Sequence, residues 1–188
     1  MPRFIIVHME KRLYKWALLE YEHLAELVGK EKLLFTNLTQ SMAKKLSPFG
    51  KTITQPIEEI PLTKPCLLDP NTEKTLTPED AKRFSDFIFG GILGDFPPQK
   101  RTQELVKLLP RVPRRNLGKQ QMSADTAVFV AKKIYDGIPF ERLFFQDGYV
   151  IPMGKNMEVS LPYRYVVEKG KAMFSEKLLD YLKKKKGF

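Results

Sequence analysis

The strongest structural signal in the chain is the stretch Phe87-Ile88-Phe89-Gly90-Gly91-Ile92-Leu93-Gly94-Asp95-Phe96-Pro97-Pro98. It opens with a short apolar run of β-branched and aromatic residues, which is typical of a strand buried on both faces. Three glycines then follow within five residues, and they allow backbone amides to come close to a ligand. Open α/β sheets bind ligands outside the carboxyl ends of their strands, so this loop is a candidate binding site. The alternative interpretation is a tight turn that binds nothing.

The glycine spacing excludes two common nucleotide-binding motifs. The order G-G-x-x-G differs from the dinucleotide fingerprint, and Pro97-Pro98 prevents the third glycine from opening a helix directly. The chain also has no Gly-Lys-Ser or Gly-Lys-Thr phosphate loop. A second strand-loop-helix junction lies at 116–127, where N-terminal helix amides are suited to a polar ligand group. The alternative there is a helix that is simply well capped, with Ser123 as the cap and Asp125 favourable to the dipole.

Strands and helices alternate on both sides of the glycine-rich stretch. We expect strands at 4–7, 32–35, 66–68, 87–89 and 112–117, and helices at 11–28, 40–46, from Thr77, at 101–109 and at 123–135. Four prolines make 47–65 a loop-like connection. This alternation predicts an α/β fold with a mainly parallel sheet and helices on both faces.

The last part of the chain has a different pattern. Between 143 and 167, β-type runs are interrupted by glycine and proline, and an amphipathic helix follows at 175–182. We therefore divide the chain into a core at 1–138 and a small β annex with a basic C-terminal helix at 139–188.

The composition limits the class of protein. The chain has 188 residues and 43% apolar side chains, which is enough to form a core and argues against disorder. A single cysteine, Cys66, excludes an internal disulfide and suggests a reducing, cytoplasmic setting. The apolar start is too short for a signal core, and no stretch approaches a membrane span, so we expect no membrane partner.

The net charge of +10 is concentrated in two segments. Residues 99–119 contain seven Lys and Arg against one Glu, and residues 169–188 contain seven Lys against two acids. The rest of the chain is close to neutral. Basic segments of this kind favour an anionic partner, such as RNA or a ribosomal particle.

Two loops and several shorter motifs together resemble a known family. The glycine-rich loop and the L-G-x-x-x-M-x-x-D-T-A pattern at 117–127 resemble the SPOUT methyltransferases. The closer resemblance covers nearly the whole chain and is to the archaeal and eukaryotic SPOUT family that contains the fungal ribosomal-protein arginine methyltransferase. It is carried by the segments 6–10, 19–21, 66–70, 78–81, 89–98, 101–102, 121–122, 125–127 and 162–165. Val7 is a departure, because the family is expected to carry Glu there.

The resemblance implies a deep trefoil knot, which is an exception to the usual rules of chain connection. It also implies that S-adenosylmethionine binds bent between the two loops. On this basis the cofactor contacts should come from Leu68, Gly90, Gly91, Ile92, Gly94, Leu117, Gly118, Gln121, Met122 and Thr126.

Arginine methylation needs carboxylates, because a guanidinium has a pKa above ~12 and is a poor nucleophile while it is protonated. Carboxylates bind the cation, orient one nitrogen and accept a proton. The candidate catalytic residues are Asp95, Glu10 and Glu20, although Glu20 is also consistent with a solvated helix face.

For the basic residues and the histidines, the expected roles are less specific. Lys100, Arg101, Arg114 and Arg115 are candidates for substrate binding, and Arg101 is also suited to hold the cofactor carboxylate or Asp95. Two histidines, His8 and His23, are too few for a multi-histidine metal site, so no metal is expected.

Three functions remain open at this stage. The first is an S-adenosylmethionine-dependent methyltransferase that modifies an arginine of a ribosomal protein. The second is a SPOUT-type RNA methyltransferase that acts on rRNA or tRNA. The third is a non-catalytic protein that binds RNA or the ribosome. We expect a monomer, as in the arginine-modifying branch of the resemblance.

Overall fold

The fold is seen in a computed structural model, which describes residues 1–91, 101–154 and 157–185. The described residues form a six-stranded parallel sheet in the order β3-β2-β1-β5-β4-β6. The strands are β1 (Arg3–His8), β2 (Leu33–Thr36), β3 (Lys51–Thr52), β4 (Pro65–Leu68), β5 (Asp86–Gly91) and β6 (Arg114–Arg115). The predicted α/β class and parallel sheet are confirmed.

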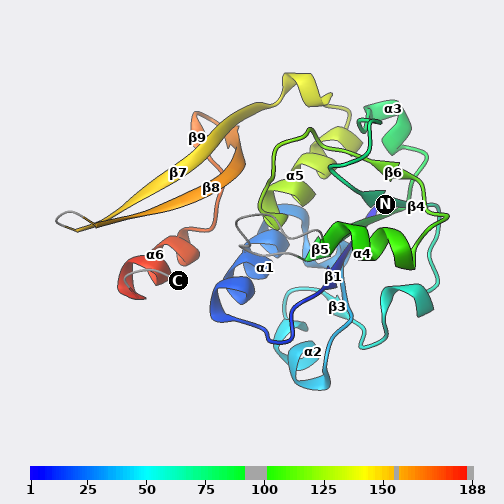
Figure 1. Ribbon diagram of the computed structural model, residues 1–188, viewed down its shortest axis with the longest axis horizontal. Coiled ribbons are helices and arrows are strands. Elements are labelled where there is room, and N and C mark those ends of the chain that lie inside the picture. The colour runs from blue at the N-terminus through cyan, green and yellow to red at the C-terminus, as the bar shows by residue number, and fades with distance from the viewer. Residues whose placement is uncertain (92–100, 155–156, 186–188) are drawn as a thin grey trace.

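Both faces of the sheet are buried, as the apolar runs predicted. Along β1, Phe4 and Ile6 pack into one hydrophobic cluster, whereas Ile5 and Val7 pack into another. Helices α1 (Lys15–Val28), α2 (Gln40–Leu46) and α5 (Ala124–Tyr135) cover the first face (Figure 1). Helix α4 (Arg101–Leu108) and the 3-10 helix Ile57–Glu59 cover the second. Because successive strand residues point to opposite faces, a strand between two helical layers must be apolar throughout.

Capping explains where the short helices begin. Helix α2 has the predicted bounds, and the Thr39 hydroxyl accepts a hydrogen bond from the backbone N–H of Met42. Helix α3 (Pro78–Ala81) begins as predicted after Thr77, whose hydroxyl accepts from the backbone N–H of Asp80 at 3.2 Å. Two further 3-10 helices, Lys30–Lys32 and Phe140–Arg142, connect the larger elements.

Three expected segments differ from the structure: a helix and a strand are shorter than expected, and a connection contains an additional strand. The first helix begins at Lys15 rather than at 11. The strand expected at 112–117 contains only Arg114–Arg115, because the backbone of Asn116 instead pairs with Lys74 and Leu76. The connection at 47–65 also contains β3, which extends the sheet beside β2.

The C-terminal part forms a second, antiparallel sheet. Its strands are β7 (Phe144–Gly154), β8 (Met157–Glu168) and β9 (Lys171–Ala172), and helix α6 (Glu176–Lys185) follows. This annex projects to one side of the parallel sheet, and α6 lies near α1 (Figure 1). It has a hydrophobic cluster of its own, centred on Ile151, Leu161, Tyr165 and Leu182.

Within the described ranges, no helix is both long and apolar enough to cross a bilayer.

Candidate functional site

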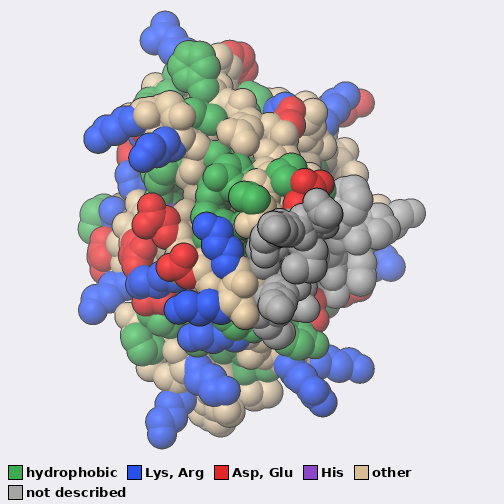
Figure 2. Space-filling model, turned by 90° about the vertical axis from the view of Figure 1, so that its left-hand side faces the viewer, with side chains coloured by type: hydrophobic (Ala, Val, Ile, Leu, Met, Phe, Trp, Pro, Cys, Tyr) green, Lys and Arg blue, Asp and Glu red, His purple; other side chains and the backbone are tan. Residues whose placement is uncertain are grey.

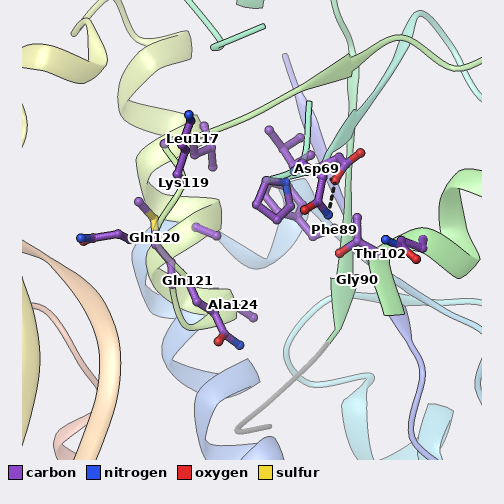
Figure 3. Close-up of a pocket in the computed structure, with 16 residues that line it drawn as sticks. Asp69, Phe89, Gly90, Thr102, Leu117, Lys119, Gln120, Gln121 and Ala124 are labelled. Atoms are coloured by element: carbon purple, nitrogen blue, oxygen red, sulfur yellow. Dashed lines mark hydrogen bonds between the residues drawn. The ribbon is translucent and has the colours of Figure 1, made fainter. Parts of the chain in front are cut away.

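A cavity of about 340 Å³ lies at the carboxyl ends of β4 and β5. Figure 3 shows Leu117 to Ala124 on one side of it and Asp69, Phe89, Gly90 and Thr102 on the other. It is lined by Leu68, Asp69, Pro70, Asn71, Phe89, Gly90, Thr102, Gln103, Leu117, Gly118, Lys119, Gln120, Gln121, Met122, Ala124 and Ala127. This is the sheet edge at which the sequence predicted a binding site.

The turn after β4 forms one wall of the cavity. The Asp69 carboxylate accepts from the backbone N–H of Asn71 at 2.9 Å and from its side-chain amide at 3.2 Å. The other oxygen of Asp69 accepts from Arg114 at 3.2 Å. The buried carboxylate therefore fixes both the turn and the neighbouring strand β6.

The loop between β6 and α5 forms the opposite wall. The Asn116 side-chain carbonyl accepts from the backbone N–H of Gly118 and from the Thr75 hydroxyl, both at 3.0 Å. Gly118 has φ +85°, in the region that favours glycine. A Cβ at this position would lie 2.8 Å from Cζ of Phe140, so the space also requires glycine.

The first turn of α5 is capped differently from the prediction. Ser123 occupies the cap position, but its side chain makes no capping hydrogen bond. The carboxylate of Glu20, from α1, instead accepts from the backbone N–H of Ala124 at 2.9 Å. The Ser123 hydroxyl contacts the Asp125 carboxylate at 2.6 Å. The cap therefore comes from a residue distant in sequence, which local pattern reasoning could not find.

Glu20 is buried, with 5% of its surface exposed, so the interpretation as a solvated helix face was wrong. Burial raises the pKa of the Glu20 carboxyl well above its usual range, and the nearby Asp125 raises it further. Asp125 is also buried, and its carboxylate lies 2.7 Å from Nδ1 of His23. This places two acidic groups and one histidine together at the start of α5.

Six of the expected cofactor residues line the cavity. They are Leu68, Gly90, Leu117, Gly118, Gln121 and Met122. Thr126 does not line it, because it is buried on another side of α5 with its hydroxyl 2.9 Å from that of Ser123. Gly91 ends β5, one residue after Gly90. Ile92, Gly94, Asp95 and Lys100 lie outside the described residues.

Sequence reasoning missed several lining residues. Asp69 and Asn71 follow β4 directly, and the rule that ligands bind at the carboxyl ends of strands applied to them as much as to the glycine loop. Thr102 and Gln103 reach the cavity from the first turn of α4.

Glu10 follows β1 and is not part of the cavity lining. His8 pairs in register with Gly91, so the end of β1 lies beside the end of β5 as expected. The buried His8 ring lies 3.1 Å from the Tyr21 hydroxyl. Burial raises the pKa of Tyr21, as do the charges of Glu20 and Glu10.

The two described arginines of β6 occupy different surroundings. Arg114 is half exposed beside the cavity wall, where it pairs with Asp69. Arg115 is mostly buried, binds Asp80 through two guanidinium nitrogens and lies over the Phe84 ring. Arg115 therefore holds β6 to α3 through its ion pair with Asp80. Its guanidinium is occupied by this pair and is not exposed for contact with a substrate. Arg101 begins α4.

Within the described part of the chain, no three His, Cys, Asp or Glu side chains are arranged to hold a metal ion.

Comparison with known proteins identifies the family. The model of the family "Protein arginine N-methyltransferase SFM1-like" matches residues 3–187. The chain belongs to this family. It is 38% identical to protein arginine N-methyltransferase SFM1 of Saccharomyces cerevisiae, across 97% of this chain and 94% of the yeast protein. The resemblance drawn from the sequence motifs is therefore confirmed.

Solved structures agree with this assignment. The crystal structure of yeast SFM1 complexed with SAM superposes with a TM-score of 0.89 at 36% identity, covering 98% of this chain and 91% of the yeast chain. The dual-specific Trm10 from Thermococcus kodakaraensis gives a TM-score of 0.63 at 21% identity, covering 75% of this chain and 96% of that chain. The second likeness shows the fold alone. The trefoil knot stays a prediction.

Proposed function

We propose that this member of the SFM1-like family is an S-adenosylmethionine-dependent protein arginine N-methyltransferase. The main support is the cavity at the ends of β4 and β5, which six of the ten expected cofactor residues line. A relative that matches almost the whole chain is a protein arginine N-methyltransferase whose structure was solved with SAM.

The residues of the cavity fit this cofactor. Leu68, Leu117, Met122 and Ala127 provide apolar contacts suited to an adenine ring. Asn71, Thr102 and Gln121 provide polar groups for the ribose and the amino acid part. The volume of about 340 Å³ lies within the usual range of roughly 300–1,000 Å³ for small-molecule pockets.

The bound cofactor supplies a methyl group activated by a sulfonium. The chain has to align the guanidinium nitrogen with that methyl carbon and to accept one proton, since methylation of a protonated arginine releases one. Three carboxylates stay proposed for this work: Glu20 of α1, which caps α5, Glu10 after β1, and Asp95, which lies outside the described residues.

We further propose a ribosomal protein as the substrate, methylated on the ribosomal particle in the cytoplasm by a monomeric enzyme. The support is the basic excess of segments 99–119 and 169–188, which suits an anionic particle whichever atom receives the methyl group. Figure 2 shows Lys and Arg side chains around the periphery of the face toward the annex. Within segment 99–119, Lys119 lines the cavity, and the half-exposed Arg114 pairs with Asp69 of the cavity wall.

The experiment is methyl transfer from labelled S-adenosylmethionine to isolated ribosomal subunits, followed by separation of protein and RNA. The proposal expects label in protein. Label confined to RNA would support the RNA methyltransferase alternative. Calorimetry with S-adenosylmethionine provides a second test, because absence of binding at millimolar cofactor would leave only the non-catalytic alternative.

A further inference from the structure

The chain between β1 and the first turn of α1 interleaves basic and aromatic side chains. It reads Lys11-Arg12-Leu13-Tyr14-Lys15-Trp16, and none of these six described residues lines the cofactor cavity. The three basic side chains and Tyr14 are exposed. Figure 1 shows the start of α1 at the lower edge of the molecule. Residues 11–16 therefore form a surface apart from the proposed active site, and we call it the α1 entry surface.

Two stacked rings form the aromatic part of this surface. The ring centroids of Tyr14 and Trp16 are 5.8 Å apart and their planes differ by 8°, which is an offset stack. Trp16 is partly buried and packs against the main hydrophobic cluster, so it holds the Tyr14 ring in place. Tyr14 keeps 45% of its surface exposed, and within the described residues Trp16 is the one ring that it contacts. The result is a fixed ring that is accessible from solvent.

The basic part of the surface is not neutralised by the chain. Residues 11–19 contain three basic residues and no acid, and the next acid, Glu20, is buried and caps α5. Within the described ranges, Lys11, Arg12 and Lys15 form no ion pair. Lys15 also begins α1, whose first turn has no acidic residue. Because a cation is unfavourable at the positive end of a helix dipole, this arrangement favours an anionic partner.

The positive charge continues from α1 onto the annex. A small cavity between the two is lined by both Trp16 and Leu182 of α6. The exposed Lys183 and Lys184 directly follow Leu182 in the chain. The basic C-terminal segment therefore lies beside the stacked rings, and the charge is spread over two elements. Such a spread suits a chain of negative charges better than a single small anion.

The exposed ring distinguishes between two anionic partners. The face of an aromatic ring is the negative side of its quadrupole, so it is unfavourable for the carboxylate of an acidic protein. A nucleobase has a π-face that stacks on such a ring, while basic side chains beside the ring bind the phosphates. In a duplex the bases are already stacked and paired, so a single strand offers more of them to the ring.

We propose that the α1 entry surface binds single-stranded RNA, with Tyr14 as the stacking ring and Lys11, Arg12 and Lys15 as phosphate contacts. The choice of RNA rests on the ribosomal particle proposed above. The surface itself requires neither the cofactor nor methyl transfer. It gives the chain an RNA contact that is separate from the cavity at the ends of β4 and β5.

The experiment is a titration of a short dye-labelled RNA without self-complementarity, followed by fluorescence anisotropy at several salt concentrations. The full chain is used without methyl donor. The same RNA annealed to its complement, an abasic oligonucleotide of equal length and an oligoglutamate peptide are the comparison ligands. Trp16 is the only tryptophan in the chain, so quenching of its fluorescence reports a base placed on the ring pair.

The variants separate the ring from the charge. Tyr14→Leu removes the ring and keeps an apolar side chain, whereas Tyr14→Phe keeps the ring. The double variant Lys11→Gln/Arg12→Gln removes two charges. Its matched control is Lys82→Gln/Arg83→Gln, because these two residues are also an exposed Lys-Arg pair and directly follow α3, far from the start of α1 (Figure 1). Thermal melting verifies the fold of each variant.

We expect the single strand to quench Trp16 and to bind at least about fivefold more tightly than the abasic oligonucleotide, because stacking contributes to affinity. Tyr14→Leu should lose at least about fivefold in RNA affinity, and Tyr14→Phe should retain it. Removal of two phosphate contacts in Lys11→Gln/Arg12→Gln should lower the slope of log affinity against log salt by about 1.4, at about 0.7 per contact. The control pair should leave that slope unchanged.

Four results would overturn the inference: no binding of RNA, equal binding of the abasic oligonucleotide, unchanged affinity in folded Tyr14→Leu, or tighter binding of oligoglutamate than of RNA. The last result would assign the surface to an acidic protein instead. Since no methyl donor is present, each of these results leaves the proposed methyltransferase function standing. Failure of methyl transfer would equally leave this RNA contact standing.

Discussion

Gly118 holds the loop between β6 and α5 against the Phe140 ring, and it does so with a positive φ. We expect Gly118→Ala to lower the free energy of unfolding by at least about 1 kcal/mol, because an L side chain is unfavourable in this backbone region. The 2.8 Å contact with Phe140 would add to that cost and narrow the cavity wall. Thermal melting and calorimetry with S-adenosylmethionine measure the two effects.

Gly137→Ala is the matched control. Gly137 also has a positive φ, +105°, but a Cβ there meets no atom within 4 Å. It should therefore show the backbone cost without the contact and without a loss of cofactor affinity. Equal losses of affinity in both variants would contradict the account of the loop.

Glu20 makes the stability of the chain depend on pH. Its native pKa is raised by burial and by Asp125, so the native state binds a proton more tightly than the unfolded chain does. The contribution of Glu20 to stability is therefore full below the ordinary glutamate pKa of 4.5 and declines as the pH rises toward the native value. Glu20→Gln removes this decline.

Parallel denaturant titrations of the two chains from pH 4.5 upward measure the difference. The free energy of unfolding of Glu20→Gln should rise relative to that of the unmodified chain as the pH increases. A constant difference across this range would show that Glu20 is ionised in the free protein, contrary to the account.

At the residue scale, the residues of the cavity were easier to predict from the sequence than the buried acidic residues were. Gly90 follows from the rule that ligands bind after strand ends and at glycine loops, whereas Leu68 and Gly118 were implied by the family resemblance. All three line the cavity. Glu20 could not be placed by any local rule, because its partner Ala124 is 104 positions away. Its burial arises from tertiary packing of α1 on α5.

Among elements, Arg115 and Asp80 connect strand β6 to helix α3. We expect Arg115→Met to lower the free energy of unfolding by about 1–3 kcal/mol, because it leaves a partly buried carboxylate without its charged donor. A double-mutant cycle with Asp80→Asn, followed by denaturant titration, measures the interaction between them.

Arg114→Met is the comparison on the same strand, and its half-exposed guanidinium should contribute less to stability. Binding to ribosomal subunits should respond in the opposite order, with Arg114 more important than Arg115. If Arg115→Met weakened ribosome binding without destabilising the fold, the structural role given to Arg115 would be wrong.

The elements that the sequence predicted well are those with local signals. Helix α3 starts at its Thr-Pro cap, and α2 has the expected bounds. Strand β6 was overestimated because Asn116 pairs with a segment 40 positions earlier, around Lys74 and Leu76. Such a partner leaves no trace in the periodicity of the strand itself.

For the whole molecule, the annex has an apolar cluster of its own and ion pairs to helix α1 of the core. Leu182 of α6 is fully buried in the annex cluster, whereas Lys177 forms exposed ion pairs with Glu22 and Glu26 of α1. We expect Leu182→Ala to cost about 2–5 kcal/mol and Lys177→Ala less than about 1 kcal/mol. Denaturant unfolding of both variants measures the two costs, and a larger loss in Lys177→Ala would contradict this order.

The overall plan of the molecule was only partly predictable. Alternating strands and helices gave the parallel sheet, and the glycine and proline pattern gave a β-rich annex. Its position beside α1 was not predictable, because it depends on contacts such as the hydrogen bond from the Arg164 backbone N–H to the Gln121 carbonyl at 2.8 Å.

The most direct test of the central claim is amino acid analysis of the protein fraction after labelled methyl transfer to ribosomal subunits. The account predicts that the label is recovered as methylarginine and that heat-denatured enzyme yields none. Recovery of the label as a methylated nucleoside, or of no label while the chain still binds S-adenosylmethionine, would contradict it.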